Sequence, residues 1–143
     1  NISEDWFGIR NEAYGILQRE DTLKEIVKLL GPDALPDEEK LILEVARMVK
    51  IGLLQQNSFD DVDTYCSPEK QFKLLKLVVD FYKLGQQSLK EGSPLSSIRE
   101  LPVVTSLLKA RMDIKDDEMP KLDQLENDMK EQFKNISGVK VTN

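Results

Sequence analysis

The sequence predicts an all-α protein, organised as a single bundle of about five or six helices. Apolar residues recur along the chain at the spacing of an amphipathic helix, and no stretch alternates between apolar and polar residues as a half-buried strand would. The chain also has no Asn-Gly or Asp-Gly dipeptide, which is the strongest short-range signal of a β-hairpin. With 143 residues, of which 40% are hydrophobic, the sequence suits one compact domain.

The first two helices are predicted to form a hairpin with an acidic turn at residues 31–39. Gly31 and Pro32 end the first helix, because glycine tolerates a positive φ and proline disfavours a helical residue before it. The second helix begins near Pro36, where three acids favour the positive end of the helix dipole, and its wide apolar face predicts burial on two sides. The apolar stripe of the first helix consists of Ile9, Ala13, Ile16, Leu23, Val27 and Leu30.

Capping residues mark the helices that follow. We expect the second helix to fade at residues 55–58 and a short helical turn to lead up to Cys66. Ser67 is a predicted N-cap, with Pro68 in the first turn of a long third helix that ends at residues 92–94.

Proline at position 102 divides the next segment, because it cannot continue a helix from the residue before it. We expect residues 1–137 to form one helical domain and residues 138–143 to form a flexible tail. The predicted helices of this second half cover residues 95–100, residues 103–112 and a last amphipathic stretch that restarts at residues 116–120.

The residue inventory excludes several kinds of chemistry. The net charge of −6 argues against a surface for nucleic acid or for anionic lipid, both of which need clustered Lys and Arg. The chain has no histidine and a single cysteine, Cys66, which excludes a zinc site and the Ser–His and Cys–His nucleophile pairs. No G-x-x-x-x-G-K-[ST] or G-x-G-x-x-G loop is present, and no apolar run is long enough for a bilayer. We therefore predict no catalytic residue and no resident metal.

Three features allow two interpretations. The hairpin at residues 31–39 is either a plain connection or a stiff, charged surface that pushes on a partner. Phe59, at a corner after polar amides, is either a core residue or an aromatic that stacks on a flat ligand. The acids Asp60, Asp61 and Asp63 either cap and solvate a turn or bind a divalent cation, although their spacing does not match an EF-hand loop.

Several segments resemble the catalytic subunits of rotary ATPases. Residues 30–41 resemble the acidic hairpin of those subunits, and the segments 45–49 and 54–59 follow as they do there. The most specific piece is Val62-Asp63-Thr64-Tyr65-Cys66-Ser67-Pro68-Glu69-Lys70-Gln71, which looks like the catalytic A subunit of the archaeal (A/V) type and unlike its non-catalytic B partner. The resemblance covers essentially the whole chain and points to the C-terminal helical domain of the catalytic A subunit.

The resemblance implies a role for the hairpin, because in F-type relatives the matching loop bears on the rotating central stalk. Ala34, Pro36 and Asp37 stand where those relatives have Glu, Ser and Glu, so this loop is less acidic and stiffer. The residues in the matching stretch, and hence the expected rotor contacts, are Asp33, Leu35, Asp37, Glu38 and Glu39.

The resemblance also implies a nucleotide contact. Phe59 and Tyr65 match two aromatics that lie near the adenine of ATP in the family, with Phe59 the first candidate and Tyr65 the second. The family's phosphate loop, magnesium-binding acid and catalytic glutamate belong to a nucleotide-binding domain that has no counterpart here. The expected catalytic and metal-binding residues of this chain are therefore none, and ATP or ADP with Mg²⁺ belongs to the full-length subunit.

The expected function follows from these assignments. The chain would be the C-terminal domain of the catalytic A subunit of a proton- or sodium-translocating ATP synthase/ATPase, transmitting nucleotide-driven domain closure to the stalk and inactive alone. Its expected partners are central stalk subunits and neighbouring B subunits, in a cytoplasmic head peripheral to the cell membrane, with no nucleic acid and no membrane insertion. The alternative is a free-standing helical adaptor that binds a partner helix. Because the chain begins with Asn1, we expect a processed product or a cut fragment.

Overall fold

The computed structural model of the chain describes residues 2–51 and 67–141, and within these residues it is an all-α bundle, as predicted. Two short 3-10 turns, η1 (Pro32–Ala34) and η4 (Asp116–Glu118), join the helices near the two ends of the bundle. The helices are α1 (Ile2–Leu30), α2 (Asp37–Val49), α3 (Pro68–Lys90), α4 (Leu95–Arg99), α5 (Pro102–Asp113) and α6 (Pro120–Val141).

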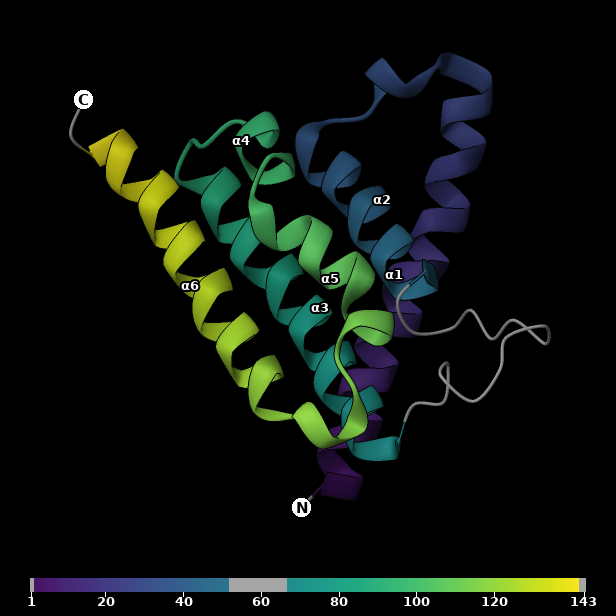
Figure 1. Cartoon of the computed structure of the whole chain (residues 1–143). Coiled ribbons are helices and arrows are strands. Elements are labelled where there is room, and N and C mark those ends of the chain that lie inside the picture. The colour runs from purple at the N-terminus through teal and green to yellow at the C-terminus, as the bar shows by residue number, and fades with distance from the viewer. Residues whose placement is uncertain (1, 52–66, 142–143) are drawn as a thin grey trace.

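Helix α3 lies at the centre of the bundle. It packs against α1 and α2 on one side and against α5 and α6 on the other, so that the domain is organised around a single long helix (Figure 1). Phe81 of α3 is fully buried, and its ring meets that of Phe133 of α6 edge to face at a centroid distance of 5.3 Å. This geometry is the one that aromatic pairs prefer, and it fixes α6 against the centre.

The predicted α1–α2 hairpin is present, and α2 is buried on two sides because it packs against both α1 and α3. The wide apolar face that predicted this arrangement is inaccessible, with Leu41, Val45 and Ala46 each 0% exposed. On α1, Ala13, Ile16 and Leu23 are buried at helical spacing. The hairpin is therefore held to the core along most of its length.

The start of α3 confirms the predicted cap and adds a long-range clamp. The Oγ of Ser67 accepts a hydrogen bond from the Lys70 amide at 3.2 Å, and the Ser67 amide donates to Oδ1 of Asp116 at 3.3 Å. The Nζ of Lys70, a residue only 2% exposed, donates to the carbonyl of Arg111 at 2.8 Å and also to that of Ile114. Lys70 therefore satisfies carbonyl groups at the end of α5, where a cation also suits the helix dipole.

Helix α6 continues to Val141, past residue 138 where the expected tail begins, and the flexibility of residues 138–143 stays a prediction. Gly138 alone is a weak signal for a helix end, since a glycine costs only about 1 kcal/mol relative to alanine and no proline follows it. Leu30, the last member of the predicted buried stripe, is 73% exposed. The expected turn at residues 58–66, with Asp60, Asp61 and Asp63, lies outside the described residues.

Candidate partner-binding surface

The α1–α2 hairpin carries a projecting end, residues 29–38, which we call the hairpin tip. In Figure 1 the end of α1 and η1 stand clear of the other helices at one corner of the molecule. Gly31 adopts φ +88°, which lets the chain turn sharply, and its amide donates to the carbonyl of Val27 at 2.8 Å. The amides of Ala34 and Leu35 donate to the carbonyls of Gly31 and Pro32 at 3.2 and 3.3 Å. The tip is thus a hydrogen-bonded turn with a defined shape.

Leu35 anchors the tip to the bundle. It was expected to be a rotor contact, but its side chain is 4% exposed and belongs to the hydrophobic core. Ala34 and Pro36, on either side of Leu35, are exposed. Leu35 is the one that turns inward because burial of its larger apolar side chain gives the largest hydrophobic free energy of the three. In this conformation a partner bound at the tip would contact the residues on either side of Leu35 and not Leu35 itself.

The acidic residues of the tip differ from Glu39, which follows them, in whether they form an ion pair. Oε2 of Glu39 lies 3.7 Å from Nη2 of Arg19 on α1, so this carboxylate links the two helices. Asp33, Asp37 and Glu38 are exposed and make no ion pair within the described part of the chain. The tip therefore presents unneutralised negative charge to its surroundings.

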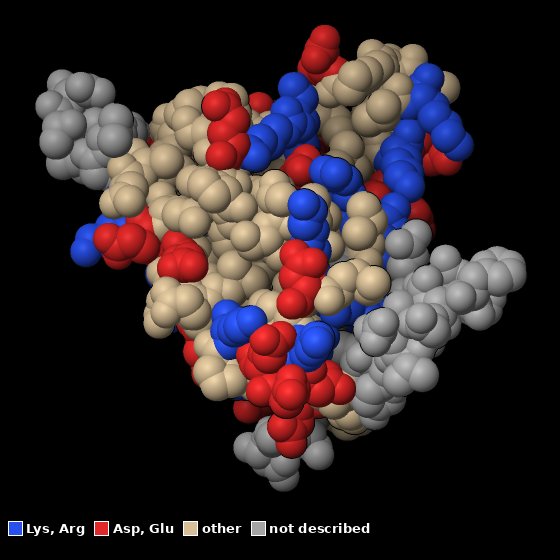
Figure 2. Space-filling model, viewed as in Figure 1, with Lys and Arg blue, Asp and Glu red and all other residues tan. Residues whose placement is uncertain are grey.

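An exposed apolar pair forms the end of α1, just before Asp33 in the chain. Leu29 is 82% exposed and Leu30 is 73% exposed, the two most exposed large hydrophobic residues among those that the structure describes. The reason is geometric: the first buried residue of α2 is Leu41, so the last turn of α1 extends past the surface that could cover it. Helical periodicity assigned Leu30 to the core and missed this pair. Figure 2 shows the tan surface of this corner beside red and blue side chains.

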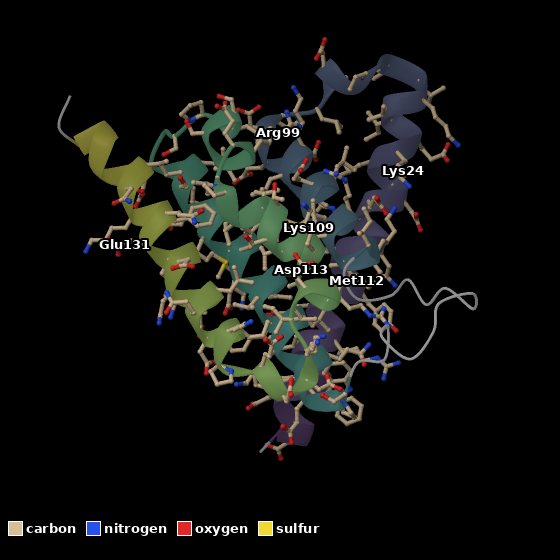
Figure 3. All side chains as sticks on the ribbon, in the orientation of Figure 1. Lys24, Arg99, Lys109, Met112, Asp113 and Glu131 are labelled. Carbon is tan, nitrogen blue, oxygen red and sulfur yellow. The ribbon has the colours of Figure 1, made fainter. Side chains whose placement is uncertain are left out.

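A buried carboxylate fixes α1 to the far end of α2. Glu20 of α1 is 5% exposed, and its Oε2 lies 2.7 Å from Nζ of Lys50 and 3.7 Å from Nζ of Lys24. Its hydrogen bond to Lys50 raises the pKa of that lysine, because the negative charge favours the ammonium form. Figure 3 shows Lys24 on the α1 side of this contact. The Glu20–Lys50 ion pair thus joins the helices of the hairpin at one end, and the buried Leu35 holds the hairpin to the core at the other.

A second ion pair brings the short helix α4 to the hairpin. Nε of Arg99 lies 3.8 Å from Oε2 of Glu44 on α2, and Figure 3 shows Arg99 where α4 approaches α2. Glu44 also lies 3.4 Å from Nη1 of Arg47. These ion pairs are partly exposed and contribute little to stability. They show that α4 lies beside α2.

A surface hollow of about 320 Å³ lies between α1, α2 and α3. Two of the cations on its rim are already paired: Arg19 with Glu39, and Lys83 with Glu12 at 3.3 Å. Tyr82, also on the rim, accepts a hydrogen bond from Gln86 at 3.1 Å, and burial raises the pKa of its hydroxyl. The pairing satisfies the charges on this rim internally, so the hollow offers an anion little to bind.

The nucleotide-contact candidates Phe59 and Tyr65 lie outside the described residues, and their assignment stays a prediction. Within residues 2–51 and 67–141, no group of three or more Cys, Asp or Glu residues is placed to hold a metal ion. No helix in these same ranges is both long enough and apolar enough to span a bilayer.

The fold and the tip define a class of protein: an all-α helical bundle whose distinctive surface, among the described residues, is a projecting hairpin with an exposed apolar pair and acids that form no ion pair. Comparison with known sequences gives the family. The sequence model described as "C-terminal domain of V and A type ATP synthase" matches residues 1–99. The A subunit of the A-type ATP synthase of Hyperthermus butylicus is 45% identical over 131 residues, which covers 90% of this chain and 22% of that protein.

Two further relatives agree. The A subunit of the A-type ATP synthase of Methanopyrus kandleri is 42% identical over 94% of this chain and 23% of its own length. The V-type ATP synthase alpha chain of Halothermothrix orenii is 42% identical over 87% of this chain and 21% of its own length. The chain belongs to the family of C-terminal domains of V- and A-type ATP synthases and corresponds to that domain of the A subunit, as the sequence resemblance indicated. It spans about a fifth of the length of these relatives.

Proposed function

We propose that this domain transmits nucleotide-driven movement of an ATP synthase catalytic subunit to the central rotor stalk, with the hairpin tip as the point of contact. The observation that carries the proposal is the way the tip is built: a hydrogen-bonded turn, held by the buried Leu35, at the end of two helices that pack against the central α3. A close-packed bundle does not deform continuously, so a rotation of the domain becomes a displacement of its tip.

In this mechanism the chemistry lies outside the domain. ATP and Mg²⁺ bind elsewhere in the full-length subunit, and closure of that site swings the helical domain as a rigid body. The energy reaches the stalk only to the extent that the tip contacts the stalk differently in the open and closed states. Turnover in the complete enzyme is coupled to translocation of protons or sodium ions, and the domain alone is inactive. Adjacent B subunits are the other proposed neighbours.

Phe59 and Tyr65 are proposed to complete the adenine pocket. Their support is the family membership and the match in spacing to the two aromatics of the relatives. A Phe59→Ala substitution in the full-length subunit should weaken nucleotide binding by about 0.5–1.5 kcal/mol, the typical value of an aromatic stacking contact. Unchanged affinity in a folded subunit would remove this role from Phe59.

The test of the stalk contact uses the assembled ATPase whose catalytic subunit ends in this domain. A variant with Leu29→Ala, Leu30→Ala, Asp33→Ala, Asp37→Ala and Glu38→Ala removes five exposed side chains of the tip and keeps Gly31, Pro32 and Leu35 of its turn. ATP hydrolysis should continue while torque on the stalk falls. Alanine at five exposed positions of α6 is the matched control, namely Asn127, Asp128, Glu131, Lys134 and Asn135. Normal torque in the tip variant would contradict the proposal.

A further inference from the structure

The apolar pair Leu29–Leu30 has features of an unoccupied binding surface. The two side chains are 82% and 73% exposed, although leucine is among the residues most often buried. They are consecutive and lie in the last turn of a helix that projects past its neighbours. Residues one position apart on a helix point about 100° away from each other, so the pair forms a convex ridge and fits a concave partner.

The charges around the ridge restrict the chemistry of that partner. The lysines of the same helical turns are already paired, Lys24 with Glu20 at 3.7 Å and Lys28 with Glu25 at 3.4 Å. The carboxylates of Asp33, Asp37 and Glu38 have no such partner among the described residues. Residues 29–40 contain four acids and one lysine, Lys40, so this end of the hairpin carries net negative charge. That charge suits Lys or Arg on the opposing surface and disfavours anionic lipid or nucleic acid.

We propose that Leu29 and Leu30 are the principal contacts of the hairpin tip, and that they insert into an apolar groove of the partner whose rim carries Lys or Arg. This inference rests on the proposed function, because the partner is the central stalk. It reverses the expected order of importance at the tip: the apolar pair supplies the affinity, and the acidic residues select the orientation. Desolvation of an apolar ridge contributes more to binding than exposed ion pairs, which are screened by water and salt.

The arrangement also gives Leu35 a distinct role. Its burial in the core holds the turn while the two leucines that precede the turn face outward. A force on the ridge is therefore received close to a residue that is fixed in the bundle. Leu35 positions the tip, whereas Leu29 and Leu30 make the contact.

The experiment divides the tip into its two chemistries in the assembled ATPase. One variant carries Leu29→Ser and Leu30→Ser, and the other carries Asp33→Asn, Asp37→Asn and Glu38→Gln. Affinity for the purified central stalk is measured with A/B heads that carry each variant, at low and at high salt. Phe7→Ser is the matched control, because Phe7 is an exposed apolar residue of the same helix, 59% exposed, far from the tip.

The Leu29→Ser, Leu30→Ser variant should bind the stalk at least about tenfold more weakly, since burial of a leucine side chain contributes more than a factor of ten to affinity. The neutralised variant should bind within about threefold of the unmodified head at high salt, where exposed charge pairs are screened. Leu29→Met with Leu30→Met should restore binding, because methionine keeps the apolar surface.

Two outcomes would overturn the inference. One is that the Leu29→Ser, Leu30→Ser variant binds normally while the neutralised variant loses affinity, which would make the contact electrostatic. The other is that Phe7→Ser weakens binding as much as Leu29→Ser with Leu30→Ser does. Either result is distinguishable from failure of the proposed function, in which removal of all five tip side chains leaves torque unchanged.

Discussion

The Nζ of Lys50 lies 2.7 Å from Oε2 of Glu20, and this contact joins α2 to α1 at the end of α2 that is remote from the hairpin tip. The Glu20 side chain is 7% exposed, whereas the Lys50 side chain is 42% exposed. An ion pair of this kind combines a desolvated acid with a base that water still reaches. It joins the two helices, and only one of its two charged groups is removed from water.

The Glu20–Lys50 pair should make stability fall at alkaline pH. The pKa of Lys50 is raised above 10.5 in the folded state, chiefly by its hydrogen bond to Glu20. Its stabilising contribution is therefore fully present below pH 10.5 and is lost as the pH rises through the folded pKa. Lys50→Gln should cost about 1–2 kcal/mol at neutral pH, a buried-pair value reduced for the exposure of Lys50.

Urea unfolding of the domain at neutral pH and at high pH measures this effect. The variant should be less stable at neutral pH and should lose less stability than the unmodified domain on the alkaline side. Lys28→Gln, which removes a largely exposed ion pair on the same hairpin, is the control and should change little. Equal alkaline losses in Lys50→Gln and the unmodified domain would show that the titrating group lies elsewhere.

Lys70→Met should destabilise the junction between α3 and α5. The substitution keeps the length of the side chain but leaves the carbonyls of Arg111 and Ile114 without their buried donor. Loss of hydrogen bonds from a charged group costs about 2–3 kcal/mol. Lys73→Met is the control on the same helix, because its ion pair with Asp123 is largely exposed, at 40% and 64%. Similar denaturation midpoints for the two variants would show that the hydrogen bonds from Lys70 to the end of α5 do not stabilise the domain.

Gln132→Ala should loosen the start of α5. Oε1 of Gln132 on α6 accepts a hydrogen bond from the Val103 amide at 2.9 Å and so caps α5, whose own N-cap residue, Leu101, supplies no side-chain bond. A lost N-cap costs about 1 kcal/mol. Gln124→Ala on the exposed face of α6 serves for comparison. Hydrogen exchange at Val103 should quicken in the first variant alone, and unchanged exchange there would refute the cap.

Gly31→Ala should strain the turn at the tip. The φ of +88° at Gly31 is one that residues with a Cβ rarely adopt, although no atom lies within 4 Å of the added Cβ. The expected loss of about 1–2 kcal/mol is therefore conformational and not steric. Gly15→Ala is a matched control: its Cβ would also meet nothing within 4 Å, but it lies within α1, where alanine should stabilise by up to about 1 kcal/mol. Thermal unfolding distinguishes the two signs.

Sequence reasoning was most successful where local chemistry decides the structure. The Ser67 cap, the Pro68 start and the turn at Gly31 depend on residues within a few positions, and the structure confirms each. The bonds from Lys70 to the end of α5 and from Gln132 to its start join residues far apart in the chain, and no local pattern marks them.

The hairpin tip shows why the candidate site was only partly predictable. Periodicity correctly identified the face of α1 that is buried, but it could not tell where α2 stops covering that face, so Leu30 was expected in the core. Leu35, an expected rotor contact, is buried, because one apolar residue between exposed neighbours turns inward to anchor the loop. Phe59 and Tyr65 lie outside the described residues and stay predictions.

The central claim is that the tip touches the rotor stalk, and a site-specific photo-crosslinker at position 30 of the assembled ATPase tests it most directly. Illumination should join this domain to the central stalk and stop ATP-driven rotation, whereas the same crosslinker at position 7, near the other end of α1, should give no stalk adduct. Adducts from position 30 that contain neighbouring head subunits and no part of the stalk would contradict the account.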